Sequence, residues 1–265
     1  MLKDITIGQY ISGHSFLHKM DPRGKIIAVM LYMIALFVIN NSMGYWSMIA
    51  VSVFIVLISQ VPIKFFLKGL KPMVFIVVLT VVLQMFMTPG EVLWQWGFLR
   101  LTREGIRQAI FMGTRLVLLV GITSVLTLTT TPIALTDGIE QLLKPLSKIG
   151  VPAHELAMMM TIALRFIPTL IEETDKIMKA QAARGADFES GNLLQRAKAL
   201  IPLLVPLFLS AFKRADELAM AMEARCYRGG ENRTRMKQLR YTYRDAVAVS
   251  VMALVLAWAV ASRWL

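Results

Sequence analysis

Long stretches of this chain carry no charged residue, and their lengths match the thickness of a lipid bilayer. Residues 26–63 contain no Lys, Arg, Asp or Glu, and turn-forming residues at 40–44 divide this stretch into two halves. Further uncharged runs cover residues 72–88, 116–135 and 246–262. A bilayer core of about 30 Å needs roughly 20 apolar helical residues, because each residue rises about 1.5 Å. The pattern therefore predicts five membrane-spanning helices.

The segment before the last predicted span has a different pattern, in which apolar residues recur at helical spacing with charged residues between them. It predicts two long amphipathic helices, one from Pro152 to Arg184 and one from about Leu193 to Arg225. The apolar runs at 156–164 and 199–212 are shorter than a span, so we place the whole segment on one side of the membrane. We expect three prolines to kink or break these helices, namely Pro168, Pro202 and Pro206.

Composition supports a membrane protein and defines its predicted domains. Hydrophobic residues make up 56% of the 265 residues and charged residues 17%, which excludes an ordinary soluble domain and a disordered chain. We expect an all-α, polytopic membrane protein. Its predicted parts are an N-terminal membrane domain with four spans at residues 1–135, a cytoplasmic coupling domain at 136–244 and a C-terminal span at 245–265.

Basic residues are distributed unevenly between the two sides of this predicted bundle. Of the 29 Lys and Arg residues, 24 lie within residues 1–25, 64–71 and 132–244, all on one side. Because basic loops remain in the cytoplasm, we expect the amino terminus and the amphipathic helices to be cytoplasmic. We interpret the net charge of +12 as this orientation together with attraction to anionic lipid headgroups, rather than as nucleic-acid binding.

The ends of the two amphipathic helices resemble each other at one constant offset along the chain. The matching positions are Asp175 with Asp216, Ala180 with Ala221, and Ala183-Arg184 with Ala224-Arg225. A guanidinium beside small alanines keeps its charge and presents a rigid fork suited to carboxylates. One arginine at a helix C-terminus can simply complement the helix dipole. The repetition favours a duplicated contact site instead.

Several chemistries lack the residues that they need. The chain contains no phosphate-binding loop, so we expect that it does not hydrolyse ATP itself and is not an enzyme. The predicted spans contain no acidic residue for an ion or proton relay. His14 and His18 have the spacing of metal ligands, but no acidic or cysteine cluster completes a site, and Cys226 is a single cysteine. We therefore expect no cofactor and no metal.

Four segments resemble motifs of the transmembrane T component of energy-coupling factor (ECF) transporters, ABC-type vitamin importers of bacteria and archaea. The sequence GHSFLHKMDPRGK at 13–25 looks like the opening of that family, and LRFIP at 164–168 resembles a second family segment. The most specific elements are Ala183-Arg184-Gly185 and Ala224-Arg225-Cys226, which are similar to the paired Ala-Arg-Gly motifs of the family. Cys226 departs from the pattern by standing where Gly is common.

This resemblance implies partners and a mechanism in the plasma membrane of a prokaryote. Arg184 and Arg225, with the motif residues beside them, would enter grooves on two cytosolic ABC ATPases, which hold the ATP and Mg²⁺. ATP-driven closing would draw the two helix ends together and pass movement to a membrane-embedded substrate-binding S component. The residues expected to bind the S component lie on apolar and Met-rich stretches: Met158, Met159, Met178, Phe208, Phe212, Met220 and Met222.

Two other functions remain as alternatives. One is a conventional ABC permease whose own spans form the substrate path, which substrate binding by the isolated chain would favour. The other is a polytopic membrane enzyme, which needs a cluster of His, Asp or Glu at bilayer depth that the spans lack. The resemblance assigns substrate choice to another chain, so the sequence does not name the vitamin or metal that is transported.

Overall fold

The computed structural model describes residues 10–96, 99–186, 188, 192, 198–229 and 238–263. Contacts divide the chain into two compact units. We call the first, formed by Gly8–Leu142 and Gln238–Leu265, the bundle unit. The second, within Leu143–Lys237, is the two-helix unit. The domain boundaries predicted from the sequence, at 135 and 245, separate parts of the chain by their expected side of the membrane. The two compact units are instead defined by contacts between residues, so the predicted boundaries stay a prediction.

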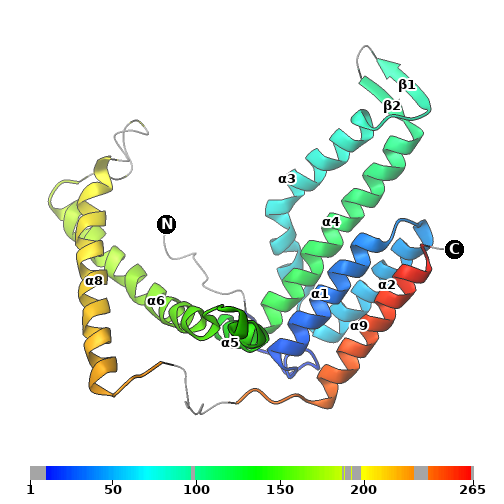
Figure 1. Cartoon of the computed structure of the whole chain (residues 1–265). Helices are drawn as coiled ribbons and strands as arrows, with labels where there is room; N and C mark the ends of the chain where they lie inside the picture. The colour runs from blue at the N-terminus through cyan, green and yellow to red at the C-terminus, as the bar shows by residue number, and fades with distance from the viewer. Residues whose placement is uncertain are drawn as a thin grey trace. The chain divides into compact units, whose positions relative to one another are not determined.

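Helices make up nearly all of the regular structure in the described residues, with one β-hairpin (Figure 1). The bundle unit contains α1 (Pro22–Val38), α2 (Ser42–Ser59), α3 (Ile63–Met87), β1 (Val92–Trp96), β2 (Leu99–Thr102), α4 (Arg103–Thr129), α5 (Pro132–Leu143) and α9 (Tyr243–Ala261). The two-helix unit contains a 3-10 helix, η2 (Lys144–Ile149), followed by α6 (Ala153–Ala183) and α8 (Ile201–Ala224).

The core of the bundle unit is small, and α1 supplies much of it. Helix α1 packs against α9 and α4, and α3 packs along α4. Tyr32 and Leu36 of α1 are fully buried against Met48 of α2 and Ile122 of α4. Large apolar side chains are exposed over the outer surface, Phe75 of α3 among them at 74%. A soluble domain rarely exposes so much continuous apolar surface, whereas a membrane-embedded bundle does.

Five of the described helices are long and apolar enough to cross a membrane: α2, α3, α4, α6 and α9. The chain is accordingly a multi-pass membrane protein. Helix α1, which carries the first predicted span, has 17 residues and is shorter than these five. The sequence led us to place α6 beside the membrane. The helix nevertheless has the length and composition of a span, because Arg165 is the single charged residue between Leu156 and Glu172. The side of the membrane on which it lies stays a prediction.

Several predicted boundaries were wrong because a helix need not end where its apolar run ends. Helix α3 begins at Ile63 and α4 at Arg103, both well ahead of their uncharged runs. Helix α4 ends at Thr129 rather than at 135, and Pro132 starts the separate helix α5. The predicted start of the second amphipathic helix, near Leu193, lies outside the described residues, and α8 itself begins at Ile201 after a turn at Leu200.

The prolines lie as expected, whereas a β-hairpin was not predicted. Pro202 occupies the first turn of α8, where proline is tolerated, and a turn at Leu200 separates α8 from the helical residues before it. Pro168 and Pro206 do lie inside α6 and α8, as expected. The antiparallel pair β1–β2 joins α3 to α4. The sequence predicted only a turn there. Among the described residues, the fold is all-α apart from this hairpin.

Asp21 begins α1 and is held by an unusually complete set of donors. One carboxylate oxygen, Oδ1, accepts the backbone N–H of Arg23 at 2.9 Å and its Nε–H at 3.0 Å. The other, Oδ2, accepts from Nη2 of Arg23 at 2.9 Å. Asp21 is 6% exposed, and a carboxylate this deeply buried needs such paired donors. Arg23 also lies over the ring of Tyr241, with 3.8 Å from its Cζ to the ring centre.

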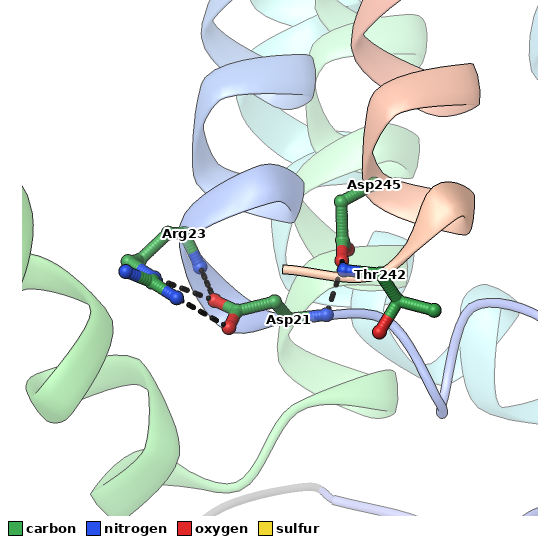
Figure 2. Close-up of polar contacts among 4 residues, drawn as sticks. All are labelled: Asp21, Arg23, Thr242 and Asp245. Atoms are coloured by element: carbon green, nitrogen blue, oxygen red, sulfur yellow. Dashed lines mark hydrogen bonds and ion pairs between the residues drawn. The ribbon is translucent and has the colours of Figure 1, made fainter. Parts of the chain in front are cut away.

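Asp245, in the first turn of α9, joins the same cluster (Figure 2). Its Oδ1 accepts the backbone N–H of Asp21 at 2.8 Å, and its Oδ2 accepts the backbone N–H of Thr242 at 2.7 Å. The second bond is that of a capping box at the start of α9. We call Asp21, Arg23, Thr242 and Asp245 the polar clasp. Gly24 permits this close approach, because a Cβ there would lie 2.9 Å from Cβ of Asp245.

Two cationic side chains hold α1 against α4. One contact is at the start of α1, beside the polar clasp, and the other is at the end of α1. Lys25, in the first turn of α1, donates to the carbonyl of Thr129 and to the hydroxyl of Thr130, both at 2.9 Å. Arg115 of α4 donates from Nη2 to the carbonyl of Ile39, just past the end of α1, at 3.2 Å. Each cation meets a helix C-terminus, where the helix dipole favours positive charge. Helix α1 is therefore fixed at both of its ends to α4, near the middle and at the C-terminus of α4.

The loop before α1 explains one of the histidines. Nε2 of His18 lies 3.0 Å from the carbonyl of Ile11, which can only accept, so Nε2 carries the proton. Nδ1 lies 2.6 Å from the hydroxyl of Ser15, which donates to it in the neutral ring. Burial lowers the pKa of His18 below its usual value. These contacts give His18 a role in holding the loop.

Replacing Asp245 by Ala is expected to destabilise the bundle by about 2–3 kcal/mol, because the buried backbone N–H of Asp21 and the part-buried N–H of Thr242 lose a charged acceptor. Asp245→Asn keeps one acceptor oxygen and should cost less. Thermal unfolding of the purified chain in detergent measures both. The exposed Asp216 of α8 gives a matched control, and Asp216→Ala should leave the melting temperature unchanged. Equal melting temperatures for Asp245→Ala and the wild type would contradict the role assigned to the polar clasp.

Candidate functional site

Helices α6 and α8 end in the same backbone turn. At the end of α6, the N–H of Gly185 donates to the carbonyl of Ala182, and the N–H of Ala186 to that of Gln181, both at 3.0 Å. At the end of α8, the N–H of Cys226 donates to Glu223 at 2.8 Å and the N–H of Tyr227 to Met222 at 3.0 Å. This pair of bonds defines a Schellman motif. The sequence repeat is therefore also a repeat in three dimensions.

Arg184 and Arg225 occupy the same position of this turn, the last residue before the chain leaves the helix. Their backbone angles agree closely, with φ −89° and ψ 6° at Arg184 and φ −91° and ψ 12° at Arg225. Both arginines are exposed, as are the other predicted motif residues Ala183, Gly185, Ala224 and Cys226. The small alanines leave each guanidinium unshielded. Each helix end thus presents a permanent positive charge that a carboxylate can bind bidentately.

Cys226 adopts a backbone conformation that usually requires glycine. Its φ is +56°, in the left-handed region, and Gly185 at the matching position of α6 has φ +89°. A Cβ in this region is strained, which explains why glycine is favoured after a Schellman turn. The departure at Cys226 therefore leaves the turn and the position of Arg225 intact, at the cost of local strain.

Helices α6 and α8 pass each other in opposite directions. Near the middle of the pair, Nη2 of Arg214 lies 3.5 Å from Oε2 of Glu173. Further along α6, the amide of Gln181 donates to the carbonyl of Pro202, near the start of α8. At the other end, the hydroxyl of Tyr227 is 3.4 Å from Nε2 of His154. The two Arg-bearing ends consequently lie at opposite ends of the pair (Figure 1).

The surfaces of α6 and α8 are largely apolar and exposed. Among the residues predicted to bind an S component, four are well exposed: Met159, Phe208, Phe212 and Met220. The other three are half-buried: Met158, Met178 and Met222. Few described residues of these two helices are buried, chiefly Ala153, Ala157 and Leu203. Exposed apolar faces of this kind mark an interaction surface, with lipid or with protein.

Sequence reasoning found the arginines but missed the contacts that hold their helices. The pairing of Glu173 with Arg214 had a signal, since the two residues are 41 positions apart, which is the offset of the repeat. The pairing of Asp21 with Asp245 had none, because 224 positions separate them and neither residue lies in a repeat.

Comparisons with known proteins cover almost the whole chain. The family described as cobalt transport protein, CbiQ, matches residues 13–236. The chain is 62% identical to a protein of Clostridium kluyveri over 258 residues, 97% of this chain and 95% of that one. It is 59% identical to a protein of Ruminiclostridium cellulolyticum over 260 residues, 98% and 97% of the two chains. It is 52% identical to one of Bacillus subtilis over 256 residues, 96% and 97%. Each relative is named energy-coupling factor transporter transmembrane protein EcfT.

Replacing Cys226 by Gly is expected to stabilise the last turn of α8 by about 0.5–1 kcal/mol, because glycine adopts the left-handed conformation without strain. Hydrogen exchange of the amides at the end of α8 measures this as slower exchange. Cys226→Ala is the matched control, since alanine removes the thiol but retains the Cβ. Equal protection in the two variants would show that the backbone at this position is not strained.

Proposed function

The chain belongs to the family of transmembrane T components of energy-coupling factor transporters, and we propose that it couples two cytosolic ABC ATPases to a membrane-embedded S component. Members of this family are multi-pass subunits of a transporter complex and are not enzymes themselves. In the proposed complex, the partner ATPases bind ATP and Mg²⁺ and carry out hydrolysis. The observation that carries the proposal is the pair of equivalent helix ends that expose Arg184 and Arg225.

Each arginine binds acidic groups in a groove of one ATPase. A guanidinium cannot lose its proton at physiological pH, so the contact does not depend on local pKa changes. Because both arginines occupy the same position of the same turn, two similar ATPases can each bind one of them in the same way. The small residues beside each arginine allow the wall of the groove to approach the helix end closely.

Movement of the ATPases reaches the S component through α6 and α8. Closing of the ATPase pair on ATP draws the two helix ends toward each other. The exposed apolar side chains of α6 and α8 contact the S component, and methionines can repack as the helices move. The S component selects the substrate, a vitamin or another micronutrient, and the bundle unit anchors the complex in the membrane.

The proposed orientation places the amino terminus and both Arg-bearing helix ends in the cytoplasm, where the ATPases are. The distribution of basic residues supports this orientation, with 24 of 29 on the proposed cytoplasmic side. A conventional permease is the alternative. Stoichiometric substrate binding by the purified chain without an S component would favour it.

The double variant Arg184→Glu/Arg225→Glu is expected to lose its ATPase partners. Truncating one member of a buried interfacial charge pair costs about 2–5 kcal/mol, so each site should weaken by roughly 30-fold or more. The measurement is recovery of ATPase subunits with the affinity-tagged chain after co-expression with the ATPases of its own transporter.

A second double variant, Lys179→Glu/Arg228→Glu, supplies the control. It makes the same charge change at exposed positions close to the two helix ends but outside the motifs. It should recover ATPases at the wild-type level. Normal recovery with Arg184→Glu/Arg225→Glu, in chains inserted normally into the membrane, would remove the central assignment.

The double variant Phe208→Glu/Phe212→Glu is expected to lose the S component while it keeps the ATPases. Both phenylalanines are well exposed on α8, at 61% and 67%, and carboxylates there would be buried without partners on binding. Quantitative mass spectrometry of the purified complex measures both kinds of subunit. Lys213→Glu, on a neighbouring exposed position, is the control. An unchanged amount of S component in the phenylalanine variant would exclude this face as the contact.

A further inference from the structure

The two helices of the repeat carry opposite charges at matching positions. At the offset that aligns the two motifs, Glu172-Glu173 of α6 corresponds to Lys213-Arg214 of α8. One turn later, Lys176 corresponds to Glu217. The motifs at the two helix ends are alike, whereas this stretch between the prolines and the ends is reversed in charge at three positions.

The structure brings two of these matching residues into contact. Arg214 donates to Glu173 across the crossing of α8 and α6, and the two residues are equivalent in the repeat. When two equivalent helices cross about a local two-fold axis, the residue at the axis meets its own counterpart. Equal charges would repel there, and reversed charges attract. The reversal of charge at this position therefore makes the contact attractive rather than repulsive.

The crossing divides the pair into arms of equal length. The number of residues from Glu173 to Arg184 equals the number from Arg214 to Arg225. Each arm is helical to its end and contains no proline or glycine before the terminal turn. With about three helical turns of roughly 5.4 Å each, an arm is about 16 Å long. The prolines inside the two helices, Pro168 and Pro206, both lie before the crossing and outside the arms.

We propose that Glu173 and Arg214 are a pivot pair, which positions α6 and α8 so that the two arginine-bearing arms extend equally from the crossing. This pair is about a third exposed, with side-chain exposures of 37% for Arg214 and 27% for Glu173. Such a pair contributes more to orientation and register than to stability. The purpose of the equal arms rests on the proposed function: arms of equal length would match two similar ATPases related by a two-fold axis.

Distances between spin labels on the two arms test the pivot without any partner. The labels are placed at Ala182 and Glu223, two exposed positions that are equivalent in the repeat and lie near the ends of the arms. The background carries Cys226→Gly, so that no native cysteine is labelled. Double electron–electron resonance on the full chain in lipid nanodiscs then gives the distribution of distances between the arms.

Each single reversal, Glu173→Arg or Arg214→Glu, places like charges at the crossing and should shift and broaden this distribution. The exchanged double variant, Glu173→Arg/Arg214→Glu, should restore the original distance and width. Glu172→Arg makes the same charge change on the neighbouring exposed position and should leave the distribution unchanged.

Three results would overturn the pivot: an unchanged distribution in the single reversals, failure of the exchanged variant to restore it, or equal broadening with Glu172→Arg. Retained helical content in every variant distinguishes a shifted register from unfolding. Since no ATPase is present, a negative result here leaves the ATPase-binding proposal standing, and that proposal is tested separately by recovery of the ATPases.

Discussion

The carboxylate of Asp245 is the contact on which the arrangement of the bundle unit depends. It holds backbone N–H groups of Asp21 and Thr242, at the starts of α1 and α9, with one oxygen for each. Helices surrounded by lipid gain little from hydrophobic burial against one another, because lipid tails are as apolar as leucine. Directional polar contacts must then fix which helix ends meet. Lys25 and Arg115 do the same for α1 and α4, since each binds a carbonyl at a helix C-terminus.

The two-helix unit is built on the opposite principle. Its helices expose most of their apolar residues, Phe208 and Phe212 among them, and are connected to each other by a few polar contacts rather than by a deep core. A surface of this kind is stable only when lipid or another protein covers it. Few buried contacts between the helices would also allow the relative movement that the proposed function requires. The two-helix unit thus combines few buried contacts with a defined contact between Glu173 and Arg214.

The sequence predicts those features whose cause is local and fails for those whose cause is distant. Charge-free runs found the cores of α2, α3, α4 and α9, because insertion into lipid penalises each charge wherever it lies. The sequence repeat predicted that Arg184 and Arg225 stand at equivalent helix ends, which the structure confirms. The starts of α3 and α4 were missed, since helices continue past the membrane-like run into basic or polar turns. The hairpin β1–β2 was missed because residues 92–102 are too few to show a clear alternation. The polar clasp joins residues 224 positions apart, and no local pattern reports such a pair.

Divergence within the repeat separates what both helices must share from what must differ between them. The Ala-Arg pair and the Schellman hydrogen bonds are the same at the two ends, as expected if both ends present an arginine to similar ATPases in the proposed complex. Glycine is favoured but not essential after the arginine, because Cys226 reaches φ +56° and the turn still forms. At the crossing the helices meet each other, and identical residues there would bring two glutamates or two arginines together. Opposite charges at Glu173 and Arg214 remove that conflict and also disfavour pairing of either helix with a copy of itself.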